Sequence, residues 1–218
     1  PAFALLWCRA HDPPPRVRQA LEYFRGMQAK KGPAKGLLPY DPRYWLFLDW
    51  CPIFKDGYPT LYNLFYVQAL RHAAELCAKI GEKAEAAQLL REEKVVVAAL
   101  RRLQINGVFA GGRNWKGALV AQDSAHCDAL AYLLDLVPQH NQVLIERLPA
   151  LVTRDVHTVE PMRPSAFFMH YIFIALDRAG KQTAVFDCIR RWWGTMVERG
   201  LATCEENFFN PAGQGSLC

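Results

Sequence analysis

The chain of 218 residues is 51% hydrophobic and 22% charged, a balance typical of a globular protein long enough to bury a core. This composition excludes a disordered chain, a collagen and a coiled coil. The formal net charge is +5, but the basic residues are scattered, and the longest apolar run is about half of the ~20 residues that a membrane span needs. We therefore expect neither a nucleic-acid partner nor a membrane partner.

The first half of the chain predicts a pair of long helices after a shorter one. A helix is indicated over residues 15–28, with a hint of another over 3–9. The next is expected from Leu61 to Ile80 with Thr60 as its N-cap, and its polar residues form one narrow stripe, so it should be buried almost all round. Gly81 ends it, and a helix over 82–103 follows with apolar residues on one side only.

The second half repeats this alternation twice. Ser124 is expected to cap an apolar helix that Pro138 breaks, and residues 139–148 form its short partner. Ser165 is expected to cap a third apolar helix, in which His170 is predicted to be a core histidine, and Gly180 separates it from an amphipathic helix over 182–199.

The pattern of elements predicts an all-α fold. Strand signals are nearly absent, and only residues around 108–109 allow a small hairpin. Alternating buried and half-buried helices joined by tight turns indicate an (α/α)6 barrel, whereas a helical solenoid would keep a fixed repeat length. In such a barrel the long connections, over 36–59, 106–123, 149–164 and from 200 onward, should gather on one face and build the site there.

These connections are rich in aromatic and acidic residues. Aromatic faces cover the C–H side of a sugar ring, carboxylates accept hydrogen bonds from its hydroxyls, and paired carboxyls supply acid and base for glycosidic cleavage. The composition is typical of a carbohydrate site, although aromatic side chains that only close the rim of the barrel would give the same pattern. The residues are Tyr40, Asp41, Tyr44, Trp45, Asp49, Trp50, Asp56, Tyr58, Trp115, Asp123, Glu160, Glu205, Glu206, Phe208 and Phe209.

Four motifs stand in order along the chain: FLDWCP at 47–52, DSAHCDALAYLLDLVP at 123–138, the stretch over 164–200, and GLATCEE at 200–206. Together they resemble the catalytic barrel of the bacterial α-L-rhamnosidases, glycoside hydrolase family 78. The first motif is similar to the family's GDW turn, with Leu48 in place of the glycine and Asp49 and Trp50 in the other two places. The third resembles the family's AL-x-x-AG and W-x-x-M-x-x-x-G patterns, and the tail GSLC resembles the start of S-x-C-H-x-W.

The second motif resembles S-x-H-A-N-A-x-A-L-x-x-G-L-V-P. It puts Ser124 and His126 at the cavity end of an inner helix. Asp128 stands where the motif has asparagine, and Asp135 where it has glycine.

The resemblance implies an inverting glycosidase that removes terminal α-L-rhamnose. In such an enzyme one carboxylate activates a water while a protonated carboxyl on the other face gives its proton to the leaving oxygen. The resemblance puts Glu206 on the catalytic base, and Glu205 where tryptophan is usual. Substrate contacts are expected from Asp49, Trp50 and His126, and from Glu205. The family's general-acid segment precedes the region resembled here, so we expect residues 1–218 to be the later part of a larger catalytic barrel.

Other interpretations remain open at this stage. The chain could be a non-catalytic barrel that binds a glycan or a protein partner, or a glycosidase for another sugar. Glu206 and Glu205 could be surface or helix-end acids, Asp49 a turn cap, Trp50 a core aromatic, and His126 a group hydrogen-bonded within the barrel.

Metal and cofactor signals are not found in the sequence. No His, Cys and carboxylate cluster has the spacing of metal ligands, so we expect no metal and no cofactor. The seven cysteines never form CxxC and lie mostly in apolar helical patterns, so we expect buried thiols, which favours a reducing, cytoplasmic compartment.

Overall fold

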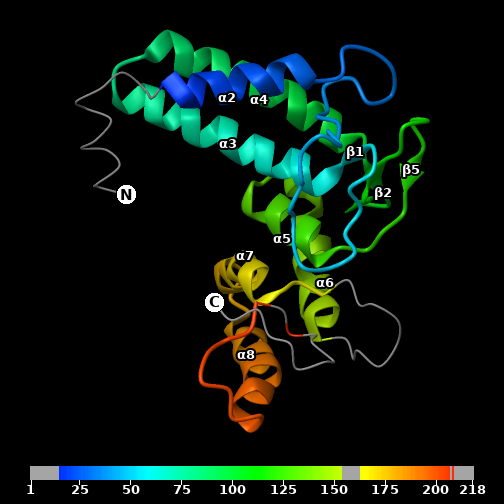
Figure 1. The fold of residues 1–218 in the computed structure, drawn as a ribbon, viewed down its shortest axis with the longest axis vertical. Coiled ribbons are helices and arrows are strands. Elements are labelled where there is room, and N and C mark those ends of the chain that lie inside the picture. The colour runs from blue at the N-terminus through cyan, green and yellow to red at the C-terminus, as the bar shows by residue number, and fades with distance from the viewer. Residues whose placement is uncertain (1–14, 154–162, 207, 209–218) are drawn as a thin grey trace.

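The computed structural model describes residues 15–153, 163–206 and 208. Their helices confirm the all-α prediction, and the helix hinted over 3–9 lies outside the described residues. Figure 1 shows the helices as α2 Pro15–Met27, α3 Thr60–Lys79, α4 Lys83–Arg101, α5 Ala125–Leu133, α6 Asn141–Thr153, α7 Ala166–Arg178 and α8 Gln182–Glu198, with a short 3-10 helix over Pro138–His140.

Helices α3 to α8 form three successive pairs, and each pair is an inner helix followed by an outer one. The inner helices contact one another in order, α3 with α5 and α5 with α7, while α4, α6 and α8 pack on their own partners. In Figure 1 the pairs follow one another from the top of the molecule to the bottom. This is the alternation expected for consecutive hairpins of an (α/α)6 barrel, and it agrees with the sequence pattern.

Helix α2 packs beside the first pair. Two of its arginines form ion pairs with α4, Arg18 with Glu85 at 2.8 Å and Arg25 with Glu92 at 2.8 Å. Its Phe24 ring contacts α3. Because these pairs are partly exposed, they fix the position of α2 more than they stabilise it.

The predicted helix starts differ in how their caps work. Ser124 caps α5 as expected, since its Oγ accepts a hydrogen bond from the backbone N–H of Cys127 at 3.3 Å. Ser165 is the N-cap residue of α7, but its side chain makes no capping bond. The prediction for Thr60 was wrong: it is the first residue of α3, and its hydroxyl donates to the carbonyl of Ala110 at 2.6 Å.

Helix α5 ends earlier than predicted because Asp135 adopts a left-handed conformation with φ of 51°. A left-handed residue after the last turn closes a helix and is most easily supplied by glycine. Asp135 therefore adopts the left-handed conformation at the position where the resembled motif has glycine. Its Oδ1 accepts a hydrogen bond from Asn141 Nδ2 at 2.7 Å.

The strands are short, and only some of them were predicted. The hairpin expected near residues 108–109 is present as β2 Gln104–Ile105 and β3 Val108–Phe109, joined by Asn106 and Gly107, which both have positive φ. A three-stranded antiparallel sheet in the order β1-β4-β5 was not predicted. Its strands are Tyr58–Pro59, Gly112–Arg113 and Leu119–Val120.

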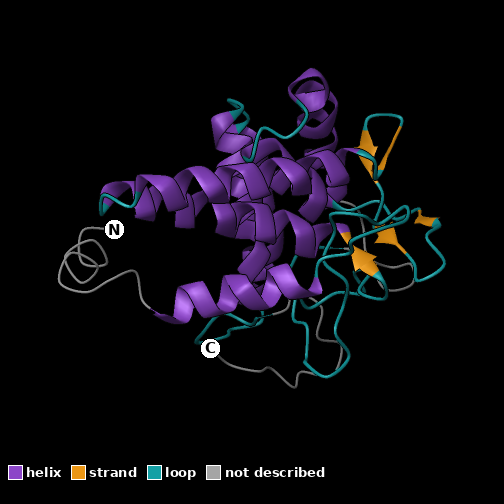
Figure 2. Ribbon diagram, turned by 90° about the horizontal axis from the view of Figure 1, so that it is seen from above, coloured by secondary structure: helices purple, strands orange, loops and turns teal. Residues whose placement is uncertain are grey.

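This sheet joins the connection over 36–59 to the connection over 106–123, because Tyr58 pairs with Arg113. The backbone N–H of Phe54 also donates to Gln122 Oε1 at 2.8 Å. Figure 2 shows the strands and the long loops gathered at one side of the helices, as the sequence predicted for these two connections. Among the described residues, no helix is both long and apolar enough to cross a membrane.

The last pair has an apolar flank that is open to solvent. On α7 the side chains of Phe167 and Ile174 are 53% and 44% exposed, and on α8 Phe186 is 57% exposed. His170 lies on the same flank and is exposed, so the prediction of a core histidine was wrong. The cysteine prediction is correct for residues 77, 127 and 188, whereas Cys51 is half-buried and Cys204 exposed.

Candidate functional site

The starts of α5 and α7 meet the connection over 36–59 at one buried carboxylate, that of Asp49. Its Oδ2 accepts a hydrogen bond from His126 Nε2 at 2.6 Å and one from the backbone N–H of Ser165 at 2.8 Å. Its Oδ1 accepts from the backbone N–H of Trp50 at 2.8 Å. One side chain therefore ties together three segments that lie far apart in the sequence.

The electrostatics of this carboxylate follow from its partners. Burial opposes the charge, but the hydrogen bonds from His126 and Ser165 outweigh it, so the pKa of Asp49 is lowered. Because an ionised carboxylate only accepts hydrogen bonds, Nε2 of His126 carries a hydrogen and Nδ1 faces the Ser124 hydroxyl at 3.4 Å. The His126 ring lies 4.3 Å from the ring of Phe168, and the side chains of Asp49 and His126 are fully closed to solvent.

Cys51 completes a group of donor atoms that the sequence spacing did not reveal. Its Sγ lies 3.6 Å from His126 Nε2, and among the described residues Asp49, Cys51 and His126 are the set whose donor atoms come within 4.8 Å of one another. Burial and the charge of Asp49 raise the pKa of Cys51 to about 12, so the thiol keeps its proton near neutral pH. With His126 donating to Asp49, the arrangement works as a hydrogen-bonded network.

Trp50 follows Asp49 in the sequence and begins a row of aromatic rings, of which Phe47 is half-buried and the other three are exposed. Its side chain is 43% exposed, and its ring lies 5.1 Å from that of Phe47. The Phe47 ring is in turn 5.4 Å from Trp45 and 6.2 Å from Phe167 on α7. We call these four residues, Trp45, Phe47, Trp50 and Phe167, the aromatic strip. Large exposed rings in one place indicate a binding surface.

The two predicted acids at 205 and 206 lie on the segment that follows α8. This segment, red in Figure 1, turns back along α8 toward α7, and Phe208 packs on Trp193 with ring centroids 4.6 Å apart. Glu205 is buried and accepts a hydrogen bond from Arg199, whereas Glu206 is half-buried.

Residues 163–165 connect the two parts of the predicted site. Ser165 donates its backbone N–H to Asp49, and two residues earlier the guanidinium of Arg163 lies 3.6 Å from the ring of Trp192 on α8. The ring of Trp192 is 6.1 Å from that of Phe208. The structure thus brings Asp49, Trp50 and His126 together, and it links them to the segment with Glu205 and Glu206 through residues 163–165.

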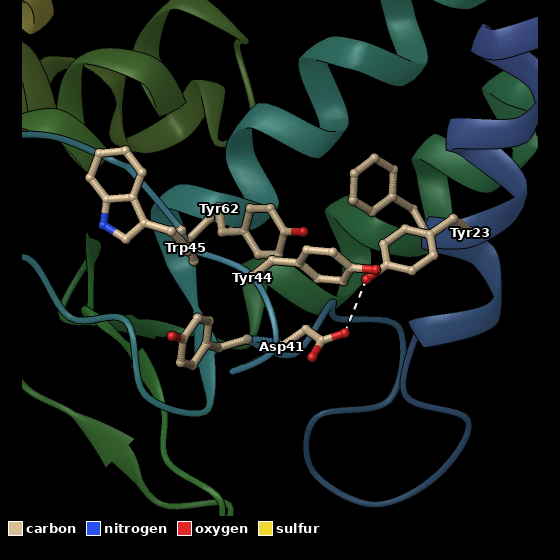
Figure 3. A pocket seen from close by; sticks show the side chains of 8 residues that line it. Tyr23, Asp41, Tyr44, Trp45 and Tyr62 are labelled. Carbon is tan, nitrogen blue, oxygen red and sulfur yellow. Dashed lines mark hydrogen bonds between the residues drawn. The ribbon is translucent and has the colours of Figure 1, made fainter.

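A hollow lies between α2, the start of α3 and the connection over 36–59. Its volume is about 350 Å³, and Figure 3 shows the tyrosine rings of Tyr23, Tyr44 and Tyr62 with the carboxylate of Asp41. We call it the aromatic pocket; its lining residues are Tyr23, Phe24, Tyr40, Asp41, Tyr44, Trp45, Leu46 and Tyr62. The sequence singled out Tyr40, Asp41, Tyr44 and Trp45 from the loop. It missed Leu46 and the residues from α2 and α3, where a helical pattern alone suggests packing.

Asp128 is an ionisable group whose environment the sequence did not predict. It lies on α5 facing α6, its side chain is 1% exposed, and its Oδ2 is 3.8 Å from Arg147 Nε. Both carboxyl oxygens lack a hydrogen-bond partner. Burial raises the pKa of Asp128 to about 7, although the charge of Arg147 opposes this shift.

Comparison with known proteins gives an informative structural match. No protein-family model and no curated protein matches the chain. Among solved structures, a family GH78 rhamnosidase of Bacillus sp. GL1 superposes with a TM-score of 0.75 at 25% sequence identity, over 92% of this chain and 20% of that enzyme. The chain therefore shares its fold with a segment that makes up about one fifth of the rhamnosidase.

Proposed function

We propose that the chain is part of a glycosidase that removes terminal α-L-rhamnose by inversion. The observation that carries this proposal is the superposition of almost the whole chain on a GH78 rhamnosidase. The loops with Trp50 and the aromatic strip lie at the starts of the inner helices α5 and α7, where a sugar could meet side chains from several hairpins at once.

Trp50 is the proposed stacking platform for the sugar that is cleaved. Its ring is accessible while its backbone is held by the Asp49 carboxylate, so the ring is presented in a fixed position. Asp49 and His126 have no exposed side-chain atoms. We therefore assign them a positioning role, in which they hold the loop that carries Trp50 against α5 and α7.

Glu206 is the proposed general base. A base of this kind must stay ionised within reach of a water, and a half-buried carboxylate on a polar segment suits that task. The charge of its neighbour Glu205 is paired with that of Arg199, so the charge beside Glu206 is compensated. We place Glu205 as support for the segment rather than as a sugar contact.

The general acid of this mechanism is proposed to lie before residue 1, which makes residues 1–218 the later part of a larger catalytic barrel. The chain spans 20% of the length of the matched rhamnosidase, which is in keeping with this division. An inverting reaction then needs the upstream acid and Glu206 to stand roughly 6.5–9.5 Å apart across the sugar ring.

The test is a panel of 4-nitrophenyl glycosides, with α-L-rhamnoside among them, incubated with the intact gene product that contains these residues. We expect release of nitrophenol from the α-L-rhamnoside, and proton NMR should show β-L-rhamnose as the first-formed anomer. Hydrolysis of another glycoside alone would discard rhamnose, and first-formed α-L-rhamnose would contradict the inverting mechanism.

A second candidate function is a non-catalytic barrel that binds glycan. The aromatic pocket and the aromatic strip favour it, because both offer accessible rings. The residues named for the pocket include one carboxylate and those named for the strip include none, so neither set holds the pair of carboxyls that hydrolysis needs. Binding of rhamnosides by calorimetry without hydrolysis of any glycoside in the panel would favour this function over the first.

A further inference from the structure

We propose that the aromatic pocket binds the sugar on the leaving-group side of the bond that is cleaved. The occupant would be an uncharged pyranose joined to the rhamnose that Trp50 holds. This inference rests on the proposed function and extends it from the cleaved sugar to its neighbour.

The walls of the pocket are suited to a sugar ring. Tyr23 and Tyr44 are 39% and 59% exposed, and their rings meet edge to face with centroids 6.1 Å apart. Tyr62 from the first turn of α3 forms a further wall (Figure 3). Accessible faces can cover the C–H side of a pyranose, while phenolic hydroxyls can exchange hydrogen bonds with its hydroxyls.

The polar groups of the pocket favour a neutral ligand. The hydroxyl of Tyr23 donates to Asp41 Oδ2 at 3.0 Å, and Arg43 Nη2 donates to the same oxygen at 2.6 Å. These contacts keep the pKa of Asp41 well below its usual value. Because the charge of Asp41 is already paired with that of Arg43, the pocket has no uncompensated charge to attract an ion, but a carboxylate fixed in this way can still accept a hydroxyl hydrogen bond.

The size of the pocket limits what it can hold. Its volume of about 350 Å³ is near the lower end of small-molecule sites, which run from about 300 to 1,000 Å³. This is room for one sugar residue rather than for a long chain. The pocket is built from α2, α3 and one loop, so its walls come from three segments of the fold.

The pocket is continuous with the proposed cleavage site through the aromatic strip. Trp45 lines the pocket and is also the first ring of the strip, 5.4 Å from Phe47, which is 5.1 Å from Trp50. A disaccharide bound along these rings would have its cleaved sugar at Trp50 and its second sugar toward Trp45. A monosaccharide glycoside with a methyl leaving group would not reach the pocket.

The experiment compares two substrates of the intact gene product. One is methyl α-L-rhamnoside, and the other is a disaccharide of α-L-rhamnose linked to glucose. The variants are Tyr23→Ala and Tyr44→Ala, whose side chains line the pocket outside the aromatic strip and are 39% and 59% exposed, so the fold should tolerate their loss. Trp115→Ala is the matched control, since Trp115 is 51% exposed, lies outside the pocket and is hydrogen-bonded to Asp56.

We expect each pocket variant to raise KM for the disaccharide about tenfold, the scale of one lost ring contact, with KM for the methyl glycoside unchanged. The Trp115 variant should behave as the wild type with both substrates. Equal changes for both substrates would overturn the inference, because the pocket would then hold the cleaved sugar, and so would no change for either. A wild-type protein that hydrolyses neither rhamnoside would overturn the proposed function and this subsite with it.

Discussion

At the scale of single residues, the carboxyl group of Asp128 has an unusual environment. Both of its oxygens are buried without a hydrogen-bond partner, and its pKa is raised. The group lies between α5 and α6, and Arg147 is its nearest opposite charge at 3.8 Å. Burying a carboxylate without hydrogen bonds costs free energy, which the raised pKa of about 7 expresses. The resembled motif has asparagine at this position, a side chain of the same shape without the charge.

We predict that Asp128→Asn stabilises the protein above neutral pH. The folded pKa of Asp128 is about 7, above its unfolded value, so its contribution to stability is present in acid and is lost as pH rises from about 4 through 7. Asparagine does not ionise, so the variant does not lose stability in this way as the pH rises. Its free energy of unfolding should exceed that of the wild type by about 1–3 kcal/mol at pH 8, with the difference vanishing near pH 4.

Urea unfolding between pH 4 and pH 8 measures this difference. Asp123→Asn is the control, because Asp123 is exposed and bonded to the same Arg147, and it should change the free energy of unfolding little at any pH. If the free energies of unfolding of Asp128→Asn and the wild type differ by the same amount at every pH in this range, the charge of Asp128 does not cause the difference.

Asp49 gives the opposite prediction. Its lowered pKa means that its stabilising contribution is present above the unfolded pKa near 4 and is lost as pH falls through the lower folded pKa. Asp49→Asn should lower the free energy of unfolding at pH 7 by about 2–4 kcal/mol, because His126 and the backbone N–H of Ser165 lose a charged acceptor.

Ser165→Ala is the matched control for this network. Ser165 uses its backbone N–H toward Asp49, whereas its buried hydroxyl has no hydrogen-bond partner. Because this hydroxyl also helps to lower the pKa of Asp49, removing it should reduce the stability at pH 7, but far less than Asp49→Asn does. If both variants unfold at the same urea concentration as the wild type, the Asp49 network does not hold the loop in the way described.

At the scale of elements, the pairing of β1 with β4 depends on a close approach of two backbones at Gly57. Its φ is +99°, and a Cβ there would lie 2.2 Å from the carbonyl oxygen of Arg113. Backbone atoms cannot move aside as the end of a flexible side chain can. The sequence therefore needs glycine at this point to bring the loop with Asp49 beside the loop with Gln122.

We predict that Gly57→Ala costs about 2–4 kcal/mol in free energy of unfolding, from left-handed strain together with the clash. Gly32→Ala separates the two causes, because Gly32 also has a positive φ of 75° but no atom within 4 Å of a Cβ. It should cost about 1 kcal/mol. Thermal melts of both variants test this, and equal losses would mean that the close approach at Gly57 does not matter.

The helices could be predicted from the sequence because each spans several turns of a regular apolar pattern. The two-residue strands of the sheet could not, since a period of two needs a longer run to be visible. The end of α5 was misplaced because a left-handed aspartate, Asp135, replaced the glycine that normally marks it. The starts of α5 and α7 were correctly placed by Ser124 and Ser165.

The candidate site was predictable only in part. The motifs drew attention to Asp49, Trp50 and His126, but the bond between Asp49 and His126 joins residues 77 positions apart, which no local spacing reveals. Cys51 and Asp128 gained their unusual environments from packing between elements. Tyr62 was missed because the sequence pattern of a helix does not distinguish a tyrosine that packs in the core from one that lines a pocket.

At the scale of the whole molecule, the open flank of α7 and α8 is its most unusual feature. Apolar side chains exposed together, including Phe167, Ile174 and Phe186, cost about 25 cal/mol per Å² when left in water. We predict that residues 1–218, produced alone, bind a hydrophobic dye and self-associate. Light scattering and dye fluorescence measure this, and a monomer with a cooperative melt and no dye binding would contradict it.

The most direct test of the account is the rate of 4-nitrophenyl α-L-rhamnoside hydrolysis by the intact gene product and two variants. Glu206→Gln removes the proposed base, and Glu198→Gln, an exposed acid at the end of α8, is the matched control. The account predicts that kcat falls by about 10²-fold or more in Glu206→Gln, the scale of a positioned acid–base group, and is unchanged in Glu198→Gln. A Glu206→Gln variant that keeps the wild-type kcat would contradict it.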